Sequence, residues 1–284
     1  MSDYRYYEFL ALDRPLTLAE LAEVRALSGG AEVTATGFTG EYKSGDFGGD
    51  PAAMMERYYD AHLYTDDSGT RQVMLRLPKE ALDLGAAEPY LLDEQVEAWV
   101  SDDHLVLDLL SEEGEDGDDE DDAGPLALIA DVRADLASGD LRPLYLAWLA
   151  AVGTWERDED AFDEDFEDEP EPPVPAGLAT LSPSQRALAG FLRLDPDLLA
   201  TAATASVPER AAEPEKLAEW IAALPASDKN SLLLRVATGE AGGARLELLR
   251  RFHGETKPAD DSATRRTVAQ LLDAAAEARG SAPR

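Results

Sequence analysis

The sequence predicts an α+β amino-terminal domain followed by an all-α carboxy-terminal domain. Three observations carry this prediction. The first half mixes alternating apolar stretches with capped helical stretches, the last third contains only short helical patterns separated by Pro and Gly, and two acidic runs lie between these parts. A chain of 284 residues is long enough to bury sizeable cores without disulfide or metal support.

Strand and helix patterns alternate in the amino-terminal half. Thr17-Leu-Ala-Glu20 is a capping-box sequence that begins one helix. Asp50-Pro51 begins a second, which helical spacing extends through Met54, Met55, Tyr58 and Tyr59 to His62. The expected strands are 4–12, 31–38, 70–77, 95–100 and 104–110, with the last two forming a hairpin. This order is compatible with a mixed or antiparallel sheet covered on one face by helices, and with a ferredoxin-like start.

Helical patterns dominate after residue 126. The segment 126–155 is expected to complete the first core, and Ser182-Pro-Ser-Gln185 and Asp195-Pro196 each begin a later helix. Further apolar stripes lie at 217–224, 232–236, 246–252 and 268–275. We therefore expect an α+β domain at 1–155 with an acidic loop at 112–122, an acidic and Pro-rich linker at 156–175, and a small helical domain at 176–284.

The negative charge is concentrated in two short runs. The chain carries 59 Asp and Glu against 25 Lys and Arg, a formal charge of −34. Residues 112–122 hold 9 acids and no base, and residues 156–171 hold 11 acids and one Arg, so the two runs supply −19 of the total. Dense like charge disfavours a packed core and argues against direct contact with nucleic-acid phosphates or anionic membranes.

Several chemistries have no support in the sequence. The chain has no Cys, which excludes disulfides, thiolate metal sites and Cys nucleophiles, and its 3 His residues do not show metal-ligand spacing. No phosphate-binding glycine motif and no GxSxG nucleophile motif is present. No apolar run is long enough to span a bilayer and the start is not a leader-like segment. We expect no cofactor, no metal and a cytoplasmic location.

The glycine-rich stretch 37–50 precedes the second predicted helix and could hold a ligand near the helix amino terminus. For such a site, Asp60 and His62 are the candidate catalytic acid–base pair, and Glu41, Asp46 and Asp50 are the candidate ligand-binding groups. The favoured interpretation is structural: the stretch packs Phe38, Tyr42 and Phe47 against the sheet, and the histidines are ordinary core or surface residues.

Three segments carry a resemblance to known proteins: YRYYEFLALDRPLT at the start, DPAAMMERYYDAHLY, and LAEWIAALPASDKNSLLLRVATGE. On these segments the chain resembles a group of uncharacterised acidic proteins of high-GC bacteria. The resemblance covers most of the chain and implies no activity and no functional residue.

The leading functional hypothesis is a non-enzymatic interaction or regulatory protein whose acidic surface and tether engage a partner with a basic surface. One alternative is a DNA mimic that inhibits a nucleic-acid-binding protein. The other is an enzyme or ligand-binding protein with a pocket between His62 and the 37–50 loop.

Overall fold

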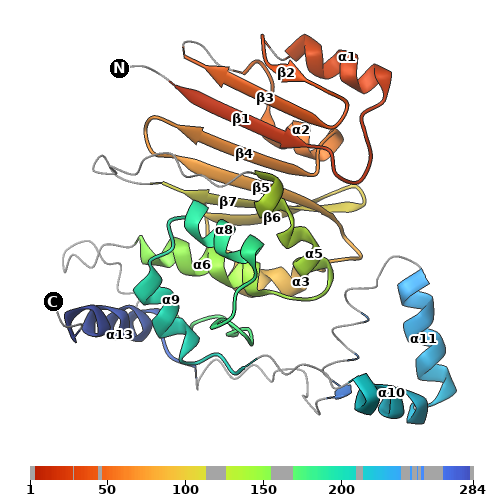
Figure 1. The fold of residues 1–284 in the computed structure, drawn as a ribbon, viewed down its shortest axis with the longest axis vertical. Helices are drawn as coiled ribbons and strands as arrows, with labels where there is room; N and C mark the ends of the chain where they lie inside the picture. Colours follow the sequence, from red (N-terminus) through yellow and green to blue (C-terminus); the bar gives the residue numbers. More distant parts are fainter. Residues whose placement is uncertain are drawn as a thin grey trace.

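A computed structural model describes most of the chain, and Figure 1 shows its fold. The described residues are 4–27, 29–43, 47–112, 126–154, 169–208, 214–237, 244, 248, 251–252 and 265–281. Most of both acidic runs, at 113–122 and 156–168, therefore lies outside the described residues, as does most of the stripe expected at 246–252.

A seven-stranded antiparallel sheet forms the centre of the molecule, in the spatial order β2-β3-β1-β4-β5-β7-β6. Every pair of neighbours is antiparallel. The strands are β1 Arg5–Leu10, β2 Glu32–Val33, β3 Gly37–Tyr42, β4 Ala61–Asp66, β5 Arg71–Pro78, β6 Val96–Ser101 and β7 His104–Ser111.

Helices cover both faces of this sheet, and not one face only as the sequence predicts (Figure 1). Helices α1 (Leu18–Leu27) and α2 (Pro51–Arg57) pack on one face, where an aromatic cluster includes Phe9, Phe38 and Tyr59. The other face packs against the remaining helices near the sheet, which are α3 Leu84–Ala87, the 3-10 turn η1 Glu88–Tyr90, α4 Leu126–Ala130, α5 Val132–Ala137, α6 Arg142–Gly153 and α8 Pro183–Phe191.

Strand alternation explains why the sheet supports two cores. Successive side chains of a strand point to opposite faces. On β1, Tyr7 and Phe9 join the aromatic cluster, whereas Tyr6 and Leu10 pack on the other core. The sheet is therefore buried on both faces near its centre, which matches its apolar strands.

The carboxy-terminal part is mainly helical, with α9 Pro196–Ala203, α10 Pro214–Ala223, α11 Ala226–Ala237 and α13 Val268–Ser281. Helix α9 packs on α6 and α13, and Leu188, Leu198 and Leu271 belong to the same buried cluster as Tyr145 of α6. This core thus continues across the predicted linker. In Figure 1, α10 and α11 lie to one side of the sheet.

The capped helices and the hairpin agree with the sequence-based expectation. Thr17 and Glu20 form reciprocal hydrogen bonds at the start of α1, and Ser182 and Gln185 form a complete capping box at α8. Asp195 caps α9. Strands β6 and β7 form the expected hairpin, joined by Asp102 and Asp103.

Two expected elements are wrong in their boundaries. The second helix ends at Arg57, and His62 lies on strand β4, which was not predicted. Residues 54–62 match a helical spacing, but Ala61 and Leu63 alternate with His62 between the two cores, so sheet pairing decides the structure. The strand expected at 31–38 is two strands, β2 and β3.

The first four strands and two helices follow one another as β1-α1-β2-β3-α2-β4. The strands lie in the order β2-β3-β1-β4, and both helices lie on one face. Strands β5, β7 and β6 then extend the sheet beyond β4.

Candidate functional site

Asp60 is a buried structural anion. Its side chain is 1% exposed and accepts hydrogen bonds from the backbone N–H groups of Leu12 and Asp13 at 2.7 and 2.9 Å. The Arg76 guanidinium also donates to it, with Nη2 at 2.7 Å. Burial alone would raise the pKa of Asp60, but these hydrogen bonds and the charge of Arg76 lower it by more, so the pKa lies below its ordinary value. The carboxylate is therefore charged, and both of its oxygens accept hydrogen bonds.

A second arginine extends this ion pair. Arg133 of α5 donates to the backbone oxygen of Arg76 at 2.7 Å and to the carboxylate of Asp13 at 2.9 Å. The group joins α5, β5 and the turn after β1. Arg133 therefore links the helical layer to the sheet beside the ion pair, and both Asp60 oxygens are occupied by hydrogen bonds.

His62 lies inside the aromatic core. The ring is fully buried, stacks on Phe9 with centroids 4.0 Å apart, and places Nδ1 2.9 Å from the carbonyl oxygen of Glu8. Because a carbonyl accepts, Nδ1 carries the proton, and among the described residues Nε2 is buried without a hydrogen-bond partner. Burial lowers the pKa of His62 to about 4, although the hydrogen bond to Glu8 opposes this shift. The ring is thus neutral at pH 7.

The predicted candidate residues are not gathered into one cleft. Asp60 and His62 follow each other closely in sequence but bond to different partners. Glu41 is exposed on β3, and Asp50 caps α2 by accepting from Ala52 N at 2.9 Å. Asp46 lies outside the described residues. Phe38, Tyr42 and Phe47 of the glycine-rich stretch are buried in the aromatic cluster, as the structural interpretation predicts.

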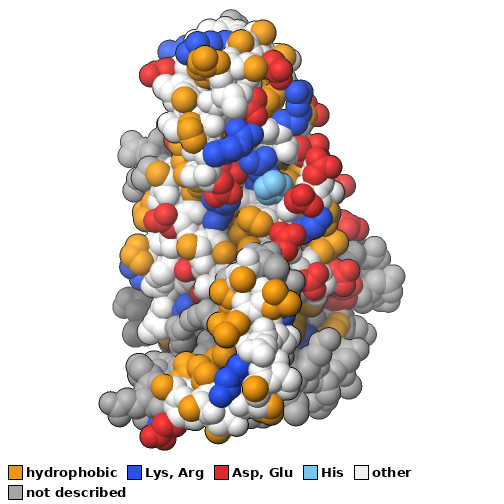
Figure 2. Space-filling model, turned by 90° about the vertical axis from the view of Figure 1, so that its right-hand side faces the viewer, with side chains coloured by type: hydrophobic (Ala, Val, Ile, Leu, Met, Phe, Trp, Pro, Cys, Tyr) orange, Lys and Arg blue, Asp and Glu red, His pale blue; other side chains and the backbone are white. Residues whose placement is uncertain are grey.

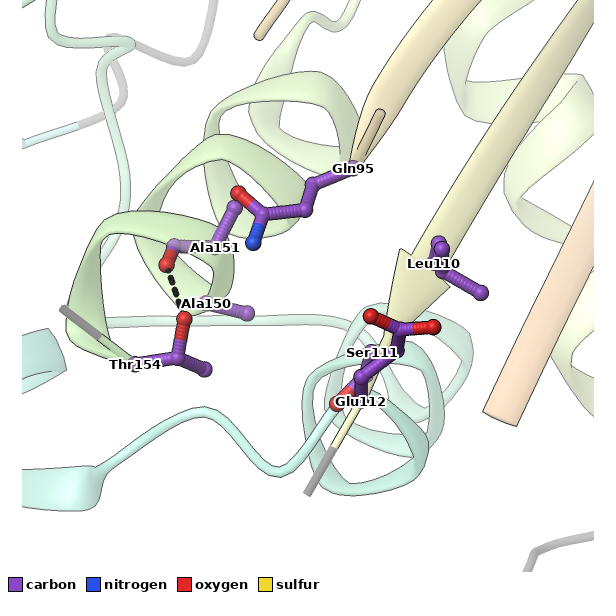
Figure 3. A pocket seen from close by; sticks show the side chains of 7 residues that line it. All are labelled: Gln95, Leu110, Ser111, Glu112, Ala150, Ala151 and Thr154. Carbon is purple, nitrogen blue, oxygen red and sulfur yellow. Dashed lines mark hydrogen bonds between the residues drawn. The ribbon is translucent and has the colours of Figure 1, made fainter. Parts of the chain in front are cut away.

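A small pocket marks the place where the two acidic runs begin. Figure 3 shows its lining, which brings together the end of β7 at Glu112, the residue before β6 at Gln95, and the end of α6 at Thr154. The enclosed space, about 10 Å³, is no more than a single water molecule needs and far below the size of ordinary small-molecule sites. Thr154 is fixed by a hydrogen bond from its Oγ1 to the Ala151 carbonyl at 2.7 Å.

The residues that line this pocket are next to both acidic runs in the sequence. The run 112–122 continues directly from Glu112, and the run 156–171 begins two residues after Thr154. The fold therefore brings Glu112, the first acid of one run, and Thr154, two residues before the other run, to one end of β6 and β7, although they are far apart in sequence.

The described surface adds further acids near this region. Asp108 of β7 lies opposite Glu97 of β6, and the Gln72 amide donates to both Asp108 oxygens at 2.9 and 2.8 Å. Burial raises the pKa of Asp108 to about 6, and the charge of Glu97 adds to this shift against the effect of Gln72. Acidic side chains also gather elsewhere on the molecule. Figure 2, which shows the right-hand side of Figure 1, has red acidic side chains along one side at mid-height, next to blue Lys and Arg side chains.

The sequence reasoning missed a buried polar group that holds the end of the second acidic run. Glu171 is 2% exposed, accepts from the Tyr145 hydroxyl, and pairs with Arg266, whose Nη2 lies 2.8 Å from it. The Arg265 guanidinium donates to the Glu171 carbonyl at 3.1 Å. The only local signal is an acid among prolines, which does not reveal partners so distant in sequence.

Within the described ranges, no group of three or more His, Cys, Asp or Glu side chains is placed to hold a metal ion. None of the helices described there has the length and apolar character needed to cross a membrane. Comparison of the chain with protein-family models, curated proteins and solved structures finds no match. The charge and the geometry of the chain itself therefore indicate its function.

Proposed function

We propose that this protein is a non-enzymatic interaction or regulatory protein whose acidic surface engages a protein partner with a basic surface. The observation that carries the proposal is the pocket of Figure 3, where Glu112, the first acid of one run, lies near Thr154, two residues before the other run. The runs supply −19 of the formal charge of −34, and β7 and α6 bring these two described residues together.

Concentrated charge of one sign favours association with oppositely charged partners, but it lowers the stability of the fold through repulsion between like charges. It raises the local concentration of oppositely charged partners and their encounter rate, over a distance of about 8 Å at physiological ionic strength. The buried roles of Asp60 and His62 support this proposal over an enzyme, since neither side chain is accessible to a substrate. The proposal includes a cytoplasmic location and no direct contact with nucleic acid.

A pull-down at low and moderate salt tests the proposal. The full chain is compared with a variant whose acids at 112–122 and 156–168 are changed to the matching amides; Glu171 is kept because it is buried. A variant in which residues 112–122 and residues 156–168 are each shuffled within their own range keeps the charge and Glu171, and is the control. We expect the wild type and the shuffled variant to recover basic proteins in a salt-sensitive manner. Equal recovery by the neutral variant would contradict the proposal.

Competition with DNA distinguishes the DNA-mimic alternative. A mimic displaces DNA from the basic proteins recovered above, whereas a partner that binds elsewhere on those proteins leaves DNA bound. Displacement by the wild type and by the shuffled variant would favour mimicry.

We also propose a ferredoxin-like unit at the start of the chain and a division of the chain into two domains. The order β2-β3-β1-β4, with α1 and α2 on one face, supports a ferredoxin-like unit at the start of the chain. The predicted domains at 1–155 and 176–284 remain a proposal for chain organisation, with the qualification that helices α8 and α9 share a core with α6.

A further inference from the structure

Strand β6 is the last strand of the sheet, and part of its outer edge is open. The backbone of Leu110 donates to Gln95, so in this antiparallel pair the odd-numbered residues of β6 direct their N–H and C=O groups toward β7. The even-numbered residues, Val96, Ala98 and Val100, direct theirs outward. Val96 uses both of its groups with Leu92.

Ala98 and Val100 therefore present the open part of the edge. Among the hydrogen bonds within the described ranges, none uses the backbone groups of these two residues. Val100 is also 50% exposed. Helix α3 lies near β6, but its buried Ala87 belongs to the core on the α6 face, so among the described residues the edge of β6 at Ala98 and Val100 has no backbone partner. A strand added here could exchange hydrogen bonds with both residues.

This edge has little of the usual protection against strand pairing. Natural edge strands are commonly very short, or carry charged side chains, above all Lys, or Pro or a bulge, and of these β6 has only the charge of Glu97. Strand β2, at the opposite edge, is only two residues long. Strand β6 reads VEAWVS over six residues, pairs with β7 without a bulge, and contains neither Lys nor Pro.

Acidic side chains surround the open edge. Asp93 and Glu94 precede β6, Glu97 lies within it, and Asp102 and Asp103 follow it; all five are exposed. Lys79 pairs with Asp103 at 2.6 Å at the hairpin turn. Glu112 lines the same pocket as Gln95, at the beginning of β6. The acids thus lie at both ends of the edge as well as along it.

We infer that β6 binds an extended basic peptide segment of a partner protein, which adds to the sheet as an eighth strand beside Ala98 and Val100. Backbone hydrogen bonds supply the pairing, and the acids around the edge select Lys- and Arg-rich strands. This inference rests on the proposed function and names the docking site for its basic partner. A second copy of the chain is a poor occupant, since two chains of charge −34 repel.

Binding of a short peptide, TKVKTRVK-amide with fluorescein on its amino terminus, to the full chain tests the inference by fluorescence anisotropy. Two control peptides carry N-methyl groups on alternate backbone nitrogens, one set in each phase. They keep every charge but lose the N–H donors that face one side of the strand. We expect one phase to weaken binding roughly tenfold or more and the other to weaken it little.

Substitution on the protein provides the matching test. Val100→Pro removes an outward N–H without removing a bond to β7, because proline is tolerated where the N–H faces away from the sheet. Val100→Thr keeps the N–H and a β-branched shape. We expect Val100→Pro to weaken the unmethylated peptide roughly tenfold and Val100→Thr to change it less than about twofold. Amide hydrogen exchange should show new protection at Ala98 and Val100 in the complex.

The outcomes separate this inference from the proposed function. The edge site would be overturned if the two methylated peptides bound equally well, whether both more weakly than the unmethylated peptide or both as tightly, and if hydrogen exchange at Ala98 and Val100 were unchanged. Salt-sensitive binding that persists through those results leaves the proposed charge-driven function standing. If the peptide does not bind at low salt, the edge inference fails, while the pull-down still decides the proposed function. A dimer detected by sedimentation and abolished by Val100→Pro would assign the edge to a second copy and also overturn the inference.

Discussion

Asp60 shows how a residue with catalytic chemistry can serve the fold. Its carboxylate accepts from two backbone N–H groups and from Arg76 in a nearly solvent-free setting. A substitution that removes its charge leaves the Arg76 guanidinium buried without its partner. This expectation separates a structural Asp60 from a catalytic one.

We expect Asp60→Asn to lower the free energy of unfolding by about 3 kcal/mol, the typical cost of breaking a buried ion pair from one side. Urea denaturation measures this change. Glu41→Gln, at an exposed position on β3, is the control and should stay within about 0.5 kcal/mol of the wild type. Similar values for both variants would contradict the structural role of Asp60.

His62 makes stability depend on pH. Its folded pKa of about 4 is below the ordinary value of 6.5, so the unfolded chain binds more protons between these values. The contribution of neutral His62 is therefore present above pH 6.5 and is lost as pH falls toward 4. We expect His62→Phe to remove this part of the pH dependence, measured as the difference between wild-type and variant urea midpoints at pH 7 and pH 5. A difference that does not change with pH would contradict a neutral buried ring.

The sequence could not reveal these residue roles. Asp60 and His62 have the residue types and spacing of an acid–base pair, and their burial depends on partners such as Arg76 and Phe9 that are remote in sequence. The packing of Phe38, Tyr42 and Phe47 was predictable, because aromatic residues between glycines have few alternatives to burial.

At the scale of elements, local signals predicted best. The capping boxes at Thr17 and Ser182 depend on residues three positions apart, and the structure contains both. Strand β4 was missed because its residues continue a helical spacing from α2, and only pairing with β1 and β5 distinguishes the two. The position of β6 at the sheet edge is likewise a property of the whole sheet.

We expect Ser182→Ala to lower the free energy of unfolding by about 1 kcal/mol, because the first turn of α8 loses the bond from Gln185 N to Ser182 Oγ at 3.1 Å. Ser227→Ala, which removes an exposed hydroxyl bound to Asp228, is the comparison and should change stability less. Thermal and urea unfolding of both variants measure the difference. An equal effect would mean that the cap contributes nothing specific to α8.

At the scale of the molecule, the end of the second acidic run is held by a buried ion pair. Glu171 joins Tyr145 of α6 to Arg266, which precedes α13. The acidic run is thereby anchored at both ends, near Thr154 and at Glu171. Glu171 thus contributes to stability, whereas the other acids of the run supply most of its negative charge.

We expect Glu171→Gln to destabilise the protein by about 3 to 5 kcal/mol, since Arg266 would keep a partly buried charge without its carboxylate. Glu169→Gln, two residues earlier and exposed, removes the same formal charge and should have little effect. Calorimetry compares the two. Equal melting temperatures would show that Glu171 acts only through net charge.

The salt dependence of the association rate tests the central claim most directly. Stopped-flow mixing of the full chain with a basic partner recovered in the pull-down gives this rate from low to moderate salt. The account predicts a steep fall with salt for the wild type and the shuffled variant, and a slower, nearly salt-independent rate for the variant with neutral runs. The same rate and salt dependence for all three proteins would contradict the claim that the acidic runs steer a basic partner to this protein.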